Sequence, residues 1–145
     1  NRHHTAGDVI KASKQIKNAG LELCVHIIAD LPWDDDADIL ADAKIINDIK
    51  ADSIKLHSLY IAKDTQLAKM YDKGEVKLLS LDEYINRAIL LLENIDKDIA
   101  VQRLVSRVTE DKSVICTHNV SWRKVLMMIE EEMIKAGAYQ GKNIS

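Results

Sequence analysis

The amino-acid sequence predicts an α/β fold with parallel strands that forms the C-terminal part of a larger barrel. Segments with helical periodicity alternate with short aliphatic and β-branched runs, the order that right-handed βαβ units require. Only three strand-like runs occur, whereas a closed barrel takes about eight. The chain also opens on a helix and not on Met, so we expect an internal start and missing upstream strands.

The composition indicates a globular unit with an aliphatic core. Hydrophobic residues make up 47% of the 145 residues, charged residues 30%, and Phe is absent. The net charge is -3 and the basic residues are scattered, so nucleic-acid binding by this part is not expected. No apolar run approaches the roughly 20 residues that span a bilayer, and no signal peptide is visible. We therefore expect a cytoplasmic protein without membrane contact.

The first part of the chain predicts two helices and two strands. Apolar residues at helical spacing predict a helix over 8–19, which Gly20 ends. The apolar run 21–29 predicts a strand buried on both faces, as in parallel sheets. A second helix is expected over 36–50 and a second strand over 53–60, whose alternate side chains point to opposite faces.

The second part predicts the remaining elements of a single unit, 1–145, because no linker or repeat interrupts it. Ser80 and Glu83 form a capping-box pattern at a helix start. The expected elements are a short helix at 64–73, a helix at 81–95, a strand at 99–105, an irregular segment at 106–118 and a last helix at 121–136.

Candidate functional residues follow the predicted strands, because ligands of parallel α/β folds bind at the carboxyl ends of the strands. Three segments are expected to converge there, 29–34, 59–64 and 102–107. Their polar members are Asp30, Asp34, Tyr60, Lys63, Asp64, Gln102 and Arg103.

The acidic run 34–38 has two interpretations. A calcium loop would need Gly at the sixth position, where Ile39 stands. An N-cap followed by acids in the first helical turn satisfies the helix dipole and is preferred. No metal site is therefore expected in this chain.

The histidines and cysteines are interpreted mainly as structural or solvated. His26 and His57 lie in predicted strands without partners at ligand spacing, and we expect satisfied strand histidines. The terminal pair His3 and His4, and also His118, are expected to be solvated. The two cysteines form no Cys-x-x-Cys pair, and we expect Cys24, in its apolar run, to be a buried free thiol.

Arg103 is the charged residue most suggestive of a ligand. An arginine inside an apolar strand needs an anionic partner. The sequence leaves two partners open, a carboxylate or phosphate of a ligand and an internal Asp or Glu.

Four segments, in matching order and spacing, resemble a bacterial branch of the radical S-adenosylmethionine (radical SAM) superfamily. The longest is 54–75, IKLHSLYIAKDTQLAKMYDKGE, which is similar to IKLHxLxxxKGTxLAxxYxxGE. The others are 1–4 (NRHH, similar to NRGH), 24–32 (CVHIIADLP, similar to AHxIxGLPGE) and 101–104 (VQRL, similar to IQRLTG). This branch is related to the Elongator catalytic subunit and to oxygen-independent coproporphyrinogen dehydrogenase.

The resemblance implies a partial (βα)6 TIM-type barrel, of which this chain supplies roughly the second half and a C-terminal helix. It implies a 4Fe–4S cluster on an upstream Cys-x3-Cys-x2-Cys loop, where SAM is cleaved to a 5′-deoxyadenosyl radical. The chain would then be part of an iron–sulfur oxidoreductase, with the missing N-terminal half of the barrel as its partner. Alone it is expected neither to be active nor to bind either cofactor tightly, and no catalytic residue is assigned.

The resemblance also implies a set of residues for the cofactor. Ile28 would pack on the adenine, and the backbone of 59–61 would contact the adenine edge. Polar side chains would contact SAM or substrate. The full set is Arg2, Ile28, Leu59, Tyr60, Ile61, Gln102 and Arg103.

Departures from the family pattern support an alternative function. Asp30 and Asp64 replace glycines that let the backbone approach a ligand closely, which counts against an adenosine site of the family type. The alternative is a non-catalytic relative that acts as an interaction module and self-associates through an open sheet edge. A third hypothesis is an unrelated barrel lyase with Lys55 or Lys63 as a Schiff-base amine.

Overall fold

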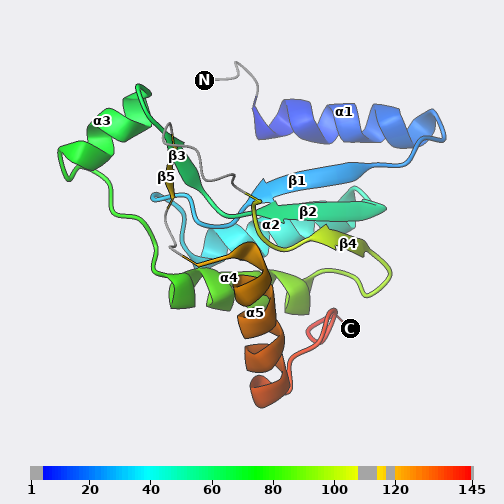
Figure 1. The fold of residues 1–145 in the computed structure, drawn as a ribbon. Helices are drawn as coiled ribbons and strands as arrows, with labels where there is room; N and C mark the ends of the chain where they lie inside the picture. The colour runs from blue at the N-terminus through cyan, green and yellow to red at the C-terminus, as the bar shows by residue number, and fades with distance from the viewer. Residues whose placement is uncertain (1–4, 108–113, 117–119, 145) are drawn as a thin grey trace.

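The computed structural model describes residues 5–107, 114–116 and 120–144 (Figure 1). Helices and strands alternate as expected, with bounds within a few residues of those predicted for most elements. In chain order they are α1 Ala6–Asn18, β1 Cys24–Ile28, α2 Asp36–Asp48, β2 Ser53–His57, β3 Tyr60–Ala62, α3 Gln66–Asp72, α4 Leu81–Asn94, β4 Ala100–Arg103, β5 Val114–Cys116 and α5 Trp122–Ala136.

A three-stranded parallel sheet in the order β1-β2-β4 forms the centre of the fold. β1 and β2 are in continuous register, so their last residues, Ile28 and His57, lie side by side. The pairing of β2 with β4 shifts after Ile54, and Arg103 becomes the partner of Lys55. The expected α/β class with parallel strands is confirmed, and the carboxyl ends of all three strands meet at one edge.

One face of this sheet carries the aliphatic core. Ile27, Ile54 and Leu56 are buried there with side chains from the helices, and α2 packs along α4 (Figure 1). Tyr84 of α4 is fully buried, and its hydroxyl donates to the Leu104 carbonyl at 2.6 Å. Helix α5 packs on α4 and adds Val125 to the core. No helix in the described part of the chain has the length and apolarity to cross a membrane.

The prediction that the first strand is buried on both faces was wrong. His26 is exposed and Ile28 is 40% exposed, whereas Ile27 between them is buried. One face of β1 is therefore open in this chain. Cys24 makes no disulfide, but it is half-buried and not the fully buried thiol expected.

The predicted strand 53–60 is also shorter than expected. It ends at His57 because the Leu59 amide turns to the carboxylate of Asp30 and leaves the parallel ladder. Strand β3 then begins and pairs antiparallel with β5. Strand β5 lies inside 106–118, which was expected to be irregular, so that prediction was wrong for 114–116.

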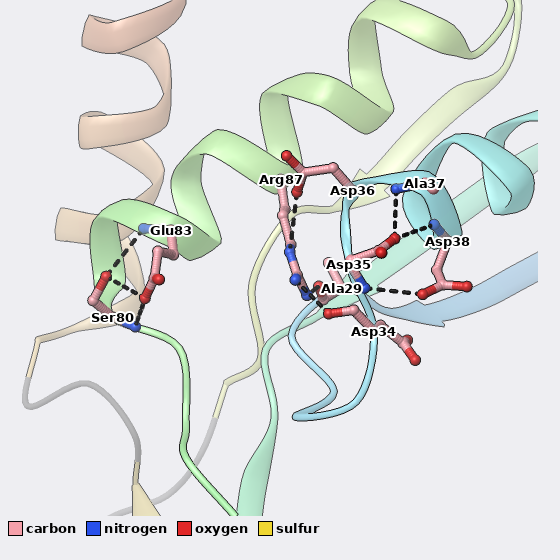
Figure 2. Close-up of polar contacts among 9 residues, drawn as sticks. All are labelled: Ala29, Asp34, Asp35, Asp36, Ala37, Asp38, Ser80, Glu83 and Arg87. Atoms are coloured by element: carbon pink, nitrogen blue, oxygen red, sulfur yellow. Dashed lines mark hydrogen bonds and ion pairs between the residues drawn. The ribbon is translucent and has the colours of Figure 1, made fainter.

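The helix caps follow the sequence signals. Asp35 caps α2 by accepting hydrogen bonds from the amides of Ala37 and Asp38. The Asp38 carboxylate in turn accepts a hydrogen bond from the Asp35 amide at 2.9 Å (Figure 2). This confirms the N-cap interpretation of the acidic run. Ser80 and Glu83 form the expected capping box at the start of α4.

Candidate functional site at the carboxyl ends of the strands

Three side chains end the three parallel strands on the open face of the sheet. Ile28 and His57 are register partners, and Arg103 pairs with Lys55, two residues before His57. Because side chains alternate along a strand, these residues lie opposite the core residues Ile27 and Leu56. The carboxyl ends of the strands meet as expected, but of these three residues only Arg103 lies in the segments that were expected to converge.

His57 is not the satisfied strand histidine that the sequence suggested. Its Nδ1 lies 3.3 Å from Oγ of Ser106, whose hydroxyl donates to the Ser58 carbonyl at 2.8 Å. Its Nε2 is buried and has no hydrogen-bond partner in the described part of the chain. The His26 ring stacks on it at 5.4 Å between centroids. A shielded acceptor without a partner costs free energy, so this nitrogen is a candidate contact for a ligand.

The burial and the nearby charges of His57 all lower the pKa of its imidazole. Burial lowers the pKa of its imidazole, and the positive charges of Arg103, His26 and Lys55 lower it further. The ring is therefore neutral at pH 7. It can accept a hydrogen bond or a proton from a bound group.

Arg103 is half-buried and makes no ion pair or hydrogen bond with a described residue. Of the two partners left open by the sequence, an internal carboxylate is thus not found in the described part. Its neighbour Gln102 bonds Oγ of Ser53 at 2.8 Å, at the start of β2. Gln102 therefore points away from the strand ends, where Arg103 lies.

Asp30, where the resemblance implies a glycine, turns its carboxylate toward the protein. It is 2% exposed and accepts a hydrogen bond from the Leu59 amide at 2.6 Å. Burial raises the pKa of this carboxyl to about 6, against the opposing effects of the Leu59 amide and of Arg87. The side chain thus ties the loop after β1 to the loop after β2.

Arg87 of α4 holds the loop after β1 in place, a role that sequence reasoning missed (Figure 2). Its guanidinium donates to the Ala29 carbonyl at 3.1 Å and to the Asp34 carbonyl, and it pairs with the Asp36 carboxylate at 3.5 Å. We call Arg87 and these three partners the Arg87 clamp. The available signal was an arginine on a largely apolar helix, with an acidic loop elsewhere in the chain to receive it.

The loop after β2 exposes only part of the predicted adenine-binding set. Leu59 and Ile61 are buried, whereas Tyr60 is 48% exposed. Asp64 has a φ of 63°, in the left-handed region that glycine favours. Arg2 lies outside the described residues, as do His3, His4 and His118.

The described residues do not fit an iron–sulfur cluster. They contain no group of three or more His, Cys, Asp or Glu side chains that could hold a metal. Cys24 lies on β1 and Cys116 on β5, which belong to different sheets.

Comparison with known proteins supports the resemblance. Uncharacterized protein MJ0486 of Methanocaldococcus jannaschii is 31% identical over 142 residues, which cover 97% of this chain and 44% of that protein. The tRNA uridine(34) acetyltransferase of the same organism is 30% identical over 90 residues, which cover 58% of this chain and 16% of that enzyme. The chain spans less than half the length of either protein.

A solved structure matches the fold along most of the chain. Archaeal Elp3 of Methanocaldococcus infernus, with an N-terminal deletion, has a TM-score of 0.79 at 22% identity over 97% of this chain and 33% of that one. This likeness confirms the expected fold class, α/β with parallel strands and a C-terminal helix, and it agrees with part of a barrel. The model of the radical SAM C-terminal domain matches residues 51–135, more than half of the sequence. The chain therefore belongs to the radical SAM C-terminal domain family, and the expected relation to the Elongator branch is confirmed.

Proposed function

We propose that this chain supplies the adenosine side of the SAM site and part of the substrate cavity in a radical SAM iron–sulfur oxidoreductase, and that it is not active alone. The observation that carries the proposal is the meeting of Ile28, His57 and Arg103 at the carboxyl ends of three parallel strands. Ligands of parallel α/β folds bind at this edge, and the chain belongs to a radical SAM family.

The described residues fit an adenosine group in part. Ile28 offers an exposed apolar surface at the end of β1, and Tyr60 offers an exposed ring at the start of β3. Leu59 and Ile61 would contribute backbone groups only, since their side chains are buried. Arg103 and the more distant Gln102 remain proposed polar contacts, as does Arg2. SAM bound to a cluster supplies a carbon-centred radical, and the part of these residues is to bind and orient the adenosine.

The cluster itself would be held elsewhere in the parent protein. The described residues offer no set of ligands for it. We therefore propose the other half of the barrel, with its three-cysteine loop, as the partner of this chain. That half would lie against β1, which is an edge strand of the described sheet.

The test is SAM cleavage by the complete reading frame that contains this chain. The protein is expressed without oxygen, reconstituted with iron and sulfide, and assayed for 5′-deoxyadenosine under dithionite. The wild type is expected to form it. Ile28→Glu is expected to weaken SAM binding at least tenfold, because a carboxylate would replace the apolar surface under the adenine.

Leu40→Glu is the matched control, since Leu40 on α2 is 42% exposed and Ile28 is 40% exposed. It should leave SAM binding unchanged. If Ile28→Glu and Leu40→Glu behave alike while SAM is cleaved, the adenosine site lies elsewhere.

One observation favours a second function, that of an interaction module. Asp30 directs a carboxylate to the Leu59 amide, a group that the adenosine site would use. Both β1 and β4 are edge strands of the described sheet, and a second copy could pair with either. A reconstituted protein that forms its cluster, leaves SAM intact and sediments as a tight dimer would support this function over the first.

A further inference from the structure

The hydrogen bonds behind His57 determine which of its ring nitrogens carries the proton. The Ser106 hydroxyl has one hydrogen, and it is donated to the Ser58 carbonyl at 2.8 Å. Toward His57, Oγ of Ser106 can therefore only accept, and Nδ1 at 3.3 Å must be the donor. In the neutral ring, Nε2 is then an unprotonated acceptor.

The surroundings of this acceptor are cationic. Arg103 comes from β4, Lys55 from β2 itself and His26 from β1, and each lowers the pKa of His57 through its charge. Neither Arg103 nor Lys55 forms an ion pair or hydrogen bond with a described residue. As far as residues 5–107, 114–116 and 120–144 show, the site thus combines two cations that lack an ion pair with one lone pair.

We propose that the open face at the strand ends binds an oxyanion that carries a hydroxyl group. The negative charge pairs with Arg103 and Lys55, and the hydroxyl donates to Nε2 of His57. Hydrogen phosphate and a hydroxy carboxylate share this chemistry, whereas a phosphate monoester above its second pKa of about 6 has lost the hydroxyl. The assignment deepens the proposed function by naming the substrate class, and it rests on that function only in taking this face as part of the substrate cavity.

The match of groups is chemical as well as electrostatic. A guanidinium binds both carboxylate and phosphate, often through two parallel hydrogen bonds. A fully ionised anion without a hydroxyl would place only acceptors against Nε2, which is itself an acceptor. A ligand with a hydroxyl relieves the cost of the unpaired nitrogen, whereas one without it does not. Because Nε2 is shielded, the ligand has to displace a side chain that covers it.

The test compares pairs of anions that differ in the hydroxyl. At pH 7 inorganic phosphate keeps a P–OH group and sulfate has none, and glycolate carries a hydroxyl that acetate lacks. Titration of this chain should show phosphate bound about tenfold more tightly than sulfate, or glycolate than acetate, which corresponds to one hydrogen bond. The pair that shows the preference tells whether the source is a phosphate or a carboxylate.

Variants separate the two parts of the site. Arg103→Gln should weaken both members of a pair about equally, by tenfold or more, and Arg103→Lys should restore part of the binding. His57→Leu should abolish the preference within the pair, whereas His57→Gln, which keeps an acceptor oxygen, should retain it. Arg123→Gln, an exposed arginine on α5, is the control and should change neither.

A measurement on the wild type stands even if a variant fails to fold. Nitrogen-15 shifts of the His57 ring should show a protonated Nδ1 and an unprotonated Nε2. The opposite tautomer, equal affinities within both pairs, or no binding of any probe would overturn the inference. None of these readouts needs a cluster or SAM, so loss of SAM cleavage with the anion preference intact would refute the proposed function alone.

Discussion

Two regions at the same edge of the sheet differ in whether their polar groups have partners within the described part of the protein. The loop after β1 pairs its polar groups internally, with Asp30 on the Leu59 amide and Arg87 on two carbonyls and a carboxylate. The open face beside it leaves Nε2 of His57 without a partner and Arg103 without an ion pair among the described residues.

The contrast separates structural from functional polar residues. A polar group that is desolvated and paired stabilises the fold, whereas an unpaired one costs stability and is retained for another reason. We therefore expect substitutions in the Arg87 clamp to change stability, and substitutions on the open face to change binding.

Removing the clamp should have the largest effect. Arg87→Ala leaves two carbonyls of the loop without their charged donor, and the Arg87 side chain that is lost is only 12% exposed. We expect the free energy of unfolding to fall by about 4 kcal/mol, in line with the loss of two charge-assisted hydrogen bonds. Urea unfolding followed by circular dichroism measures it.

Arg87→Lys serves as the internal comparison. Lysine keeps the charge but lacks the planar fork, so it should recover only part of the loss. If Arg87→Ala costs no more than Arg123→Ala on the exposed side of α5, the clamp is not structural and the contrast fails.

The second effect is a pH dependence at Asp30. Its pKa is raised from 3.8 to about 6 in the folded state, mainly by burial. Between these values the folded state binds more protons than the unfolded state, so stability falls as pH rises. The cost is absent below about pH 4 and fully present above about pH 6, and reaches about 3 kcal/mol.

Asp30→Asn removes this titration while keeping an acceptor for the Leu59 amide. From pH 4 to pH 7 we expect the variant to gain about 3 kcal/mol relative to the wild type. Urea unfolding at the two pH values measures the change. A constant difference between variant and wild type would show that the carboxyl does not titrate in this range.

The sequence was sufficient for the helices and the three parallel strands, but it missed the sheet of β3 and β5 and the partners of the side chains. Helical periodicity and cap signals located α2 and α4, since these depend on residues close in sequence. The Arg87 clamp joins residues more than 50 positions apart, which no local pattern contains. The missing partner of Nε2 of His57 could not be predicted, because the surroundings of the ring depend on how β2 packs against the segment after β4.

The ends of the strands were also difficult to predict, because they depend on contacts between residues far apart in the sequence. The alternation of side chains in the sequence continues from Ile54 to Tyr60 and therefore predicts a longer strand. The Leu59 amide instead donates to the Asp30 carboxylate, and the parallel strand ends at His57. The meeting of the three strand ends at one edge was predicted correctly, because it depends on topology alone.

A third, smaller effect concerns Asp64. This residue adopts a left-handed φ of 63°, which costs an L-residue free energy that glycine avoids. Asp64→Gly should therefore stabilise the fold by about 0.5–1 kcal/mol, reduced by the extra freedom of glycine in the unfolded chain. Lys50, with a φ of 52°, is the matched control, and Lys50→Gly should give a similar gain in urea unfolding.

If Lys50→Gly stabilises and Asp64→Gly does not, the aspartate side chain contributes something that glycine cannot replace. The loop after β2 would then belong with the Arg87 clamp as a structural region. Equal gains in the free energy of unfolding would mean that only the backbone conformation matters at position 64.

The smallest change in stability is expected on the open face. Arg103→Gln removes a half-buried guanidinium that has no ion pair or hydrogen bond with a described residue, so the free energy of unfolding should stay within about 0.5 kcal/mol of wild type. It can even rise slightly, because a positive charge that acts on the His57 ring is removed. Urea unfolding checks this in parallel with the phosphate titration. A loss as large as that of Arg87→Ala would mean that Arg103 has an internal partner and that the two regions do not differ, whereas unchanged stability with lost anion binding is the result that only a ligand-directed arginine produces.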